Sequence, residues 1–130
     1  MPDFSDQPAS VAEYRSLRMR AGMRAAPDAT VETGLKGTLH GVWLREHGEL
    51  VGMGRVIGDG GCFAQVTDIV VDPACQGQGW GTKIVARIVH WCDTELPSGC
   101  FVSLIADAGA EGLYERAGFE FRTGMSRLIP

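Results

Sequence analysis

The chain has 130 residues, of which 45% are hydrophobic and 22% charged, and its formal net charge is −4. The length and composition predict one globular domain over residues 1–130 and exclude a fibrous or disordered chain. The sequence has no run of roughly 18 apolar residues that could span a membrane. The negative net charge excludes a basic surface that coats nucleic acid. Because the N-terminus is acidic and polar, unlike a secretory signal, we expect a cytoplasmic protein that binds neither nucleic acid nor membrane.

Two helices are predicted in the N-terminal third. Ser10 and Glu13 have the spacing of a capping box, and the apolar residues after them recur at helical spacing, which predicts a helix over residues 10–24. Its four arginines form either a solvated face or the rim of a site for an acidic ligand: Arg15, Arg18, Arg20 and Arg24. A second short helix is expected over residues 29–36 and should end at Gly37.

Strand patterns follow these helices. Residues 39–45 and 49–57 are separated by a short turn that contains Gly48, which predicts a hairpin. A glycine-rich turn then leads into residues 62–71, whose apolar end, Ile69-Val70-Val71, indicates a buried strand. Asp72-Pro73 should end that strand.

The apolar period changes from Gly79 onward and predicts an amphipathic helix of about 16 residues. The remaining segments are expected to form a strand (100–106), a short helix (110–117) and two last strands (119–122 and 125–129). The order strand, helix, strand makes residues 62–71 and 100–106 parallel neighbours, so the fold class is α/β with a mixed sheet.

The cysteines and histidines do not predict a metal site. Cys62, Cys75, Cys92 and Cys100 form no C-x-x-C pair, and the three histidines are scattered. We interpret the four cysteines as buried free thiols of a reducing compartment.

A glycine-rich turn joins strand 62–71 to the following helix. Gly77, Gly79 and Gly81 allow several backbone N–H groups to converge on one anion beside the helix N-terminus, which suits a phosphate or pyrophosphate. The spacing is G-x-G-x-G, and Thr rather than Gly precedes Lys83, so neither the dinucleotide fingerprint nor the Walker A loop fits. The alternative is a turn that only lets the helix pack closely.

The segment Gln76-Gly77-Gln78-Gly79-Trp80-Gly81 resembles the Q/R-x-x-G-x-G/A pattern of the GNAT-type acyl-CoA N-acyltransferase superfamily. It follows Val71-Asp72-Pro73, as the loop of that superfamily follows a strand ending in V-D-P. The segment Gly112-Leu113-Tyr114-Glu115-Arg116-Ala117-Gly118-Phe119 is similar to the superfamily's F/L-Y-x-x-x-G-F signature. The resemblance runs from about residue 39 to the C-terminus, with both motifs in the expected order.

The resemblance implies a GNAT-like mixed, splayed sheet flanked by helices, with acetyl-CoA as co-substrate. The pantetheine arm would lie between strands 62–71 and 100–106. The first of these strands is bulged in the superfamily, and the backbone of Ile69, Val70 and Val71 would pair with pantetheine. The pyrophosphate would be held by the loop residues Gln76, Gly77, Gln78, Gly79, Trp80, Gly81 and Thr82.

The implied chemistry is direct attack by a primary amine of a small molecule or peptide on the acetyl thioester. Tyr114 matches the tyrosine that protonates the leaving thiolate in many relatives, and its other reading is packing of the short helix. Asp68 is the first candidate for the general base and Asp107 the second, although either could simply accept hydrogen bonds. Gln65 and Thr67 are weaker candidates for the cleft.

The chain departs from the superfamily pattern at two places. Asp107-Ala108-Gly109-Ala110 stands where many relatives have an Asn that touches pantetheine, and only residues 2–4 are available for the first strand. The sheet edge left exposed there predicts a homodimer. Two alternatives stay open: a non-catalytic acyl-CoA-binding or regulatory domain, and an interaction protein with a purely structural glycine loop. The acceptor would contact Tyr14, the arginines of the first helix, the second helix and the hairpin.

Overall fold

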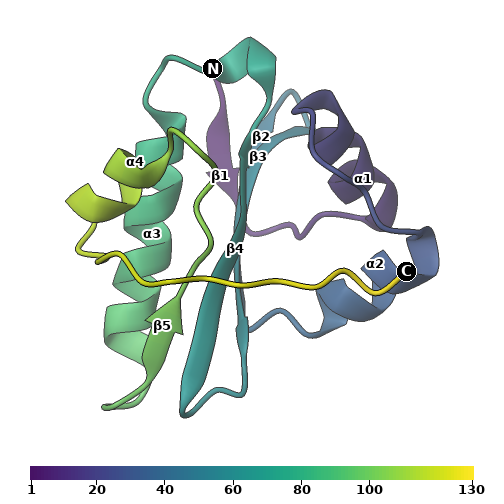
Figure 1. Cartoon of the computed structure of the whole chain (residues 1–130). Coiled ribbons are helices and arrows are strands. Elements are labelled where there is room, and N and C mark those ends of the chain that lie inside the picture. The colour runs from purple at the N-terminus through teal and green to yellow at the C-terminus, as the bar shows by residue number, and fades with distance from the viewer.

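The computed structural model describes all 130 residues as a five-stranded mixed sheet with helices on both faces (Figure 1). The strands stand in the sheet in chain order: β1 (Asp3–Ser5), β2 (His40–Glu46), β3 (Glu49–Gly58), β4 (Phe63–Val71) and β5 (Phe101–Ser103). β1 to β4 are antiparallel neighbours, and β5 is parallel to β4. This arrangement confirms the predicted fold class, an α/β sheet with one parallel crossover.

The helices cover the two faces of the sheet in pairs. One face carries α1 (Val11–Arg20) and α2 (Asp28–Lys36), and the other carries α3 (Trp80–Glu95) and α4 (Glu111–Arg116) (Figure 1). A short 3₁₀ turn, η1 (Pro73–Cys75), connects β4 to the glycine-rich loop. No helix is long and apolar enough to cross a membrane.

The first helix begins as predicted and ends early. The Ser10 hydroxyl accepts from the Glu13 backbone N–H, and the Glu13 carboxylate accepts from the Ser10 N–H, which completes the capping box. The helix ends at Arg20 rather than at residue 24, because Gly22 takes a φ of +78° and the Met23 N–H turns back to the Arg18 carbonyl.

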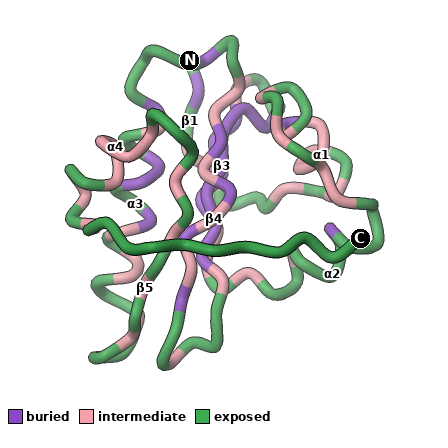
Figure 2. Tube along the Cα trace, viewed as in Figure 1, coloured by how far each residue is buried: buried purple, intermediate pink, exposed green.

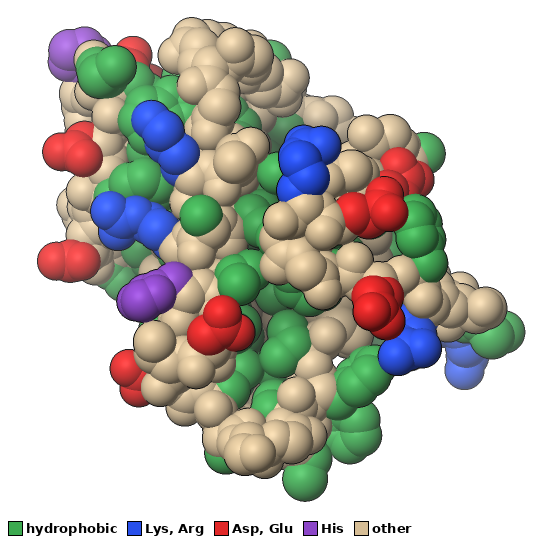
Figure 3. Space-filling model, turned by 90° about the vertical axis from the view of Figure 1, so that its left-hand side faces the viewer, with side chains coloured by type: hydrophobic (Ala, Val, Ile, Leu, Met, Phe, Trp, Pro, Cys, Tyr) green, Lys and Arg blue, Asp and Glu red, His purple; other side chains and the backbone are tan.

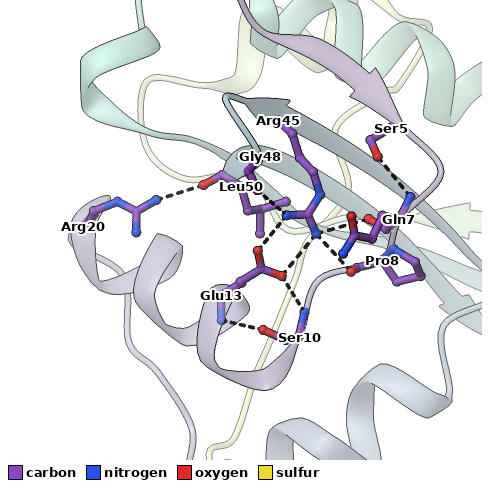
Figure 4. Close-up of polar contacts among 9 residues, drawn as sticks. All are labelled: Ser5, Gln7, Pro8, Ser10, Glu13, Arg20, Arg45, Gly48 and Leu50. Carbon is purple, nitrogen blue, oxygen red and sulfur yellow. Dashed lines mark hydrogen bonds and ion pairs between the residues drawn. The ribbon is translucent and has the colours of Figure 1, made fainter.

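A buried arginine fastens the first turn of α1 to the β2–β3 hairpin (Figure 4). The guanidinium of Arg45 donates to both carboxylate oxygens of Glu13, at 2.6 Å (Nη1 to Oε2) and 3.1 Å (Nη2 to Oε1). It also donates to the carbonyls of Gln7, Pro8 and Gly48. The N-terminal segment is therefore held in place by one side chain that the sequence analysis did not single out.

This ion pair makes the stability of the fold depend on pH. The Arg45 guanidinium, which donates hydrogen bonds to Glu13, lowers the pKa of that carboxyl from 4.5 to about 2. A lowered folded-state pKa means that the stabilisation is complete above pH 4.5 and is lost as the pH falls toward 2. Because Glu13 is partly exposed, we expect Glu13→Gln to cost about 1–2 kcal/mol of unfolding free energy at pH 7, less than the ~3 kcal/mol equivalent to the full shift.

Urea unfolding at pH 7, 5, 4 and 3 tests this expectation. Gln keeps the capping box, so the difference between wild type and the variant should shrink steadily below pH 4.5. Glu32→Gln is the matched control, because Glu32 pairs with Lys36 at 3.7 Å on an exposed surface and should contribute under about 0.5 kcal/mol. A pH-independent difference would contradict the assignment.

The hydrophobic core lies on both faces of the sheet (Figure 2). Between the sheet and α3 the buried side chains are Val42, Val56, Ala64, Val66, Ile84 and Ile88. Between the sheet and α1 they are Leu17, Trp43, Leu50, Met53 and Val70. The interior strands β2, β3 and β4 are therefore held from two sides, which gives the central sheet a rigid position.

The two parallel strands separate soon after they meet. β4 and β5 pair only at Phe63↔Phe101, Ala64↔Val102 and Gln65↔Ser103. β4 then continues to Val71, whereas β5 ends at Ser103 rather than at the predicted residue 106. The strand is shorter because its backbone leaves the sheet, and this separation is the splay that the resemblance implied.

The last two predicted strands do not form. Residues 119–122 and 125–129 are extended but belong to no sheet, and beyond Phe119 no backbone hydrogen bond involves this segment. Apolar and polar residues alternate over 119–122 but not over 125–129, and a strand also needs a neighbouring strand to pair with. The prediction is wrong for this reason, and the segment instead crosses in front of β4 and β5 (Figure 1).

The thiols are free, as predicted, but they differ in burial. Cys75 is buried, Cys92 and Cys100 are half-buried and Cys62 is exposed in the β3–β4 turn. The expectation that all four are buried is therefore wrong for Cys62, because the turn carries it away from the sheet.

Candidate active site

β4 contains a bulge at the centre of the sheet. Asp68 and Ile69 together oppose the single residue Gly54 of β3. Asp68 has a φ of +56°, in the left-handed region that Asp adopts more readily than most residues. The bulge expected from the resemblance is present, and an acidic residue occupies its unusual conformation.

The bulge reverses which side chains face which helices. Before it, Ala64 and Val66 pack with α3. After it, Asp68 contacts α1 and Val70 packs in the α1 cluster. Strict alternation would have placed the Asp68 carboxylate in the α3 core, so the extra residue is what brings it to the α1–α2 face.

Asp68 lies in a buried polar cluster on that face. Its side chain is only 4% exposed, and both carboxylate oxygens accept hydrogen bonds. Oδ1 accepts from Arg18 Nη1 at 2.5 Å, and Oδ2 accepts from the Tyr14 hydroxyl at 2.8 Å and from Arg55 Nη1 at 3.4 Å. We call Tyr14, Arg18, Arg55 and Asp68 the α1-face cluster.

The α1-face cluster also ties the two N-terminal helices to the sheet. Arg18 donates through Nε to the carbonyl of Arg24, beyond the end of α1. Arg55 donates to the Gly34 carbonyl of α2 and to the Thr38 hydroxyl, both at 3.2 Å. Substituting any charged member would therefore disturb the walls of this face as well as the charge inside it.

Burial and the nearby Asp68 charge raise the pKa of Tyr14 to about 12. Its hydroxyl thus stays protonated and donates to Asp68 at neutral pH.

The solvated-face interpretation of the α1 arginines is wrong for Arg18, which is mostly buried. Tyr14 and Arg18 are one helical turn apart, and this spacing was the available signal for a shared partner.

The glycine-rich loop leads directly into α3. Gly77 and Gly79 have φ values of +78° and +86°, and apart from the adjoining backbone no part of the chain lies within 4 Å of where a Cβ would stand on either. Gly79 is the N-cap of α3, so the first backbone N–H groups of the helix open onto this space. The Gln76 amide donates to the Val71 carbonyl at 2.9 Å and fixes the loop to the end of β4.

The other predicted loop residues differ in what they present. Gln78 and Thr82 are exposed, whereas the Trp80 side chain is buried. The Trp80 ring contacts Phe4 edge-on, and Lys83 Nζ lies 4.4 Å from the centroid of the Trp80 ring. Trp80 can therefore offer only its backbone to a ligand. Gly81 lies in the first turn of α3, close to Leu113 of α4.

The predicted pantetheine strand has free backbone on one side. β5 pairs with β4 only as far as Gln65, so the β5-facing donors and acceptors from Val66 to Val71 have no sheet partner. Ile69 and Val70 lie in this stretch, and the Val71 carbonyl already accepts from Gln76. An amide-bearing chain lying in the splay could pair with the remaining groups.

Tyr114 lies on α4, on the opposite side of the sheet from the α1-face cluster (Figure 1). Its ring packs edge-on against Phe119, with centroids 6.3 Å apart, and lines a cavity of about 310 Å³ beside residues 104–106. Its hydroxyl makes no hydrogen bond within the chain, unlike that of Tyr14. Burial, with the charge of Asp107 as a smaller cause, raises the pKa of Tyr114 above 10.0.

The candidate residues thus form two groups on either side of the splay. Asp68 stands with the α1-face cluster, and Tyr114 and Asp107 stand with α4, so the structure does not bring Asp68 and Tyr114 together. Gln65 is half-buried at the mouth of the splay and Thr67 is half-buried between Gln65 and the bulge. A thioester held in the splay would lie between the two groups.

Comparison with known proteins identifies the class to which this fold and site belong. Residues 9–119 match the sequence profile described as the Acetyltransferase (GNAT) family. This match covers most of the chain, and the chain therefore belongs to the GNAT acetyltransferase family.

Particular relatives support the same family. The chain is 35% identical to serotonin N-acetyltransferase 2, chloroplastic, of Oryza sativa subsp. japonica over 83 residues, which are 60% of this chain and 40% of that protein. It is 28% identical to GCN5-related N-acetyltransferase 2, chloroplastic, of Arabidopsis thaliana over 108 residues, which are 82% and 39% of the two chains. The chain thus spans about two fifths of the length of these curated relatives.

A solved structure is similar over almost the whole chain. A protein from meticillin-resistant Staphylococcus aureus, described as a protein of unknown function and probable acetyltransferase, is 35% identical and has a TM-score of 0.92. The similarity covers 99% of this chain and 100% of that one.

Proposed function

We propose that this chain transfers the acetyl group of acetyl-CoA to a primary amine of a small molecule or peptide by direct attack in a ternary complex. The observation that carries the proposal is the splay between β4 and β5. At one end of it the β4 backbone has unpaired N–H and C=O groups, and at the other end lies the N-terminus of α3. A molecule with amide groups at one end and a pyrophosphate at the other matches this sequence of donors. Acetyl-CoA is such a molecule, and the GNAT family generally uses it.

Several parts of the chain would act on the bound thioester. The free N–H groups around the bulge would polarise the carbonyl. The amine nitrogen would then form a bond to the carbonyl carbon as the carbon–sulfur bond breaks. Tyr114 would donate its proton to the leaving thiolate, and the proton that the amine nitrogen loses would pass to solvent, from which the tyrosinate regains one. The raised pKa of Tyr114 keeps its proton in place at neutral pH.

The acceptor amine would approach from the α1–α2 face. The α1-face cluster lies there, and its charged groups are already paired with one another. We propose that Asp68 chiefly holds this wall in place, because both of its oxygens are engaged. Its role as general base stays a prediction, as does that of Asp107, which is exposed on the other side of the splay.

Calorimetric titration with acetyl-CoA, CoA and NAD tests the proposal, with Gly79→Ala as the critical variant. We expect micromolar binding of acetyl-CoA and CoA, and none of NAD. An alanine at a φ of +86° is strained by about 1–2 kcal/mol. The backbone would relax by turning the first N–H groups of α3 away from the ligand. Gly79→Ala should therefore weaken the binding of acetyl-CoA about tenfold or more.

Gly81→Ala is the matched control. Gly81 has no positive φ, and an added Cβ would meet only Leu113 Cδ2 at 4.0 Å, an ordinary contact. The affinity of Gly81→Ala for acetyl-CoA should stay within about twofold of wild type.

Release of free thiol with a panel of amines then tests turnover. Binding without thiol release would favour a non-catalytic acyl-CoA-binding domain, and the absence of binding would overturn the proposal.

A further inference from the structure

The two N-terminal helices carry a surplus of positive charge, although the whole chain is acidic. Residues 10–37 contain five basic and three acidic side chains, a net charge of +2, whereas the rest of the chain contains seven basic and thirteen acidic ones, a net charge of −6. The face of the sheet that α1 and α2 cover is therefore the more favourable one for a negatively charged ligand.

The acidic side chains of these helices do not neutralise the α1-face cluster. Each of them forms an ion pair with a basic side chain outside the cluster: Glu13–Arg45, Asp28–Arg15 and Glu32–Lys36. Inside the cluster, Asp68 is the one carboxylate between Arg18 and Arg55. Tyr14 adds no charge, because its raised pKa of about 12 keeps the hydroxyl protonated. One positive charge of the cluster is thus left unbalanced in a mostly buried wall.

Arg18 has a nitrogen available for an anion. All three guanidinium nitrogens of Arg55 donate hydrogen bonds within the chain. Arg18 donates through Nε to the Arg24 carbonyl and through Nη1 to Asp68, whereas its Nη2 donates to no group of the chain. The one side-chain nitrogen or oxygen that is both fully buried and unpartnered is Arg45 Nε, so Arg18 Nη2 is accessible to solvent.

This nitrogen lies beside the proposed reaction centre. Arg18 Nη1 contacts the carboxylate of Asp68, the residue with the left-handed conformation in the β4 bulge. The thioester carbonyl would be polarised at that bulge, so an anion on Arg18 would stand close to the reacting amine. An acceptor that suits both positions has a primary amine and a carboxylate joined by a short carbon chain, as a free amino acid does.

The opposite face would repel the same carboxylate. Hydrophobic side chains gather in a hollow on the α3–α4 face, and acidic side chains stand around it (Figure 3). Three glutamates and one arginine line the cavity beside Tyr114: Glu111, Glu115, Glu120 and Arg122. An acceptor with a carboxylate should therefore point it toward α1 and away from α4.

We infer that Arg18 binds a carboxylate of the acceptor, so that the acceptor is a free amino acid rather than an amine without an acidic group. The inference rests on the acetyl transfer proposed above and names the class of its acceptor. Nη2 would donate charge-assisted hydrogen bonds to the carboxylate, and the bound acceptor would balance the surplus charge of the cluster. Arg18 thus determines specificity, and Asp68 holds it in position.

Thiol release with matched sets of acceptors tests the inference. Each set contains an L-amino acid, its primary amide and the amine that lacks the carboxyl carbon, for example leucine, leucinamide and 3-methylbutylamine. Sets with small, aliphatic, aromatic and acidic side chains are used, and β-alanine and γ-aminobutyrate vary the distance between amine and carboxylate. For the preferred set, kcat/KM for the amino acid should exceed that for both neutral analogues at least about tenfold, because a charged hydrogen bond is lost with the carboxylate.

Arg18→Gln is the critical variant. Gln keeps a hydrogen-bond donor near Asp68 but has no charge, so KM for the amino acid should rise at least about tenfold with little change in kcat. KM for the neutral amine should stay within about twofold. The ratio of the two kcat/KM values does not depend on how much of the variant is folded, so structural damage alone would leave this ratio unchanged.

Two further variants complete the comparison. Arg18→Lys keeps the charge, but its single ammonium group lacks the separate Nη2, so the preference for the amino acid should fall here as well. Arg87→Gln is the matched control, because it removes one positive charge from α3, where the exposed Arg87 lies over the Phe4 ring on the other side of the sheet. Its preference should equal that of wild type.

The outcomes separate this inference from the proposed reaction. Wild-type turnover of the neutral amines that equals or exceeds turnover of the amino acids would overturn the inference and leave the acetyl transfer standing. An unchanged preference in both Arg18 variants would also overturn it. Thiol release with none of the acceptors would contradict the proposed reaction, and this inference with it.

Discussion

Tyr114→Phe is expected to lower kcat by about 100-fold or more, because it removes the only group proposed to give a proton to the thiolate. The ring and its edge-on contact with Phe119 are kept, so the thermal midpoint should change little. The dissociation constant for acetyl-CoA should stay within about twofold, because a proton transferred only in the transition state adds nothing to ground-state binding.

Two measurements separate proton donation from packing. Tyr114→Leu removes the ring as well, so it should lower the thermal midpoint in addition to kcat. If Tyr114 only packs α4 against the domain, the Phe variant should keep most of its activity and the Leu variant should lose it. A Phe variant with wild-type kcat would therefore end the proposal that Tyr114 is the acid.

Asp68→Asn is expected to have the largest effect on stability, about 2–4 kcal/mol of unfolding free energy. It leaves Arg18 and Arg55 mostly buried without their counter-charge, and removing one partner of a buried ion pair is strongly destabilising. Asn accepts the left-handed conformation at φ +56° as well as Asp does, so the substitution changes the charge without straining the bulge.

Urea unfolding of Asp72→Asn provides the comparison. Asp72 pairs with Arg20 at 2.8 Å, but the Arg20 side chain is 41% exposed to solvent, so this variant should lose less than about 1 kcal/mol. The rate profile against pH tests the other role of Asp68. If the Asn variant is as stable as wild type but loses both turnover and the acidic limb of the profile, then Asp68 is the general base and not chiefly a structural anchor.

Local patterns predicted the elements well where a motif carried its own geometry. The capping box at Ser10 and Glu13 began α1 as expected, and Gly118 follows α4 with a φ of +97°. The amphipathic period placed α3, whose buried residues include Ile84 and Ile88. Each of these signals acts within one or two helical turns, so the chain alone is enough to specify it.

Pairing between distant segments was the part that local patterns could not predict. Residues 125–129 were expected to form a strand, yet the chain provides no neighbouring strand for them. Residues 104–106 were expected to continue β5, but the sheet splays there. A strand is defined by hydrogen bonds to another strand, and alternation reports only which faces are apolar.

The candidate site divides in the same way. By itself the sequence determined the order of the elements, the glycine-rich turn before α3 and the tyrosine of α4, because each depends on neighbouring residues. Only the tertiary structure decided that Asp68 joins Tyr14, Arg18 and Arg55 rather than the α3 core. The reason is the single extra residue of the bulge. It reverses the facing of β4 and brings the Asp68 side chain to Arg18 and Tyr14, which lie 50 and 54 positions away in the chain.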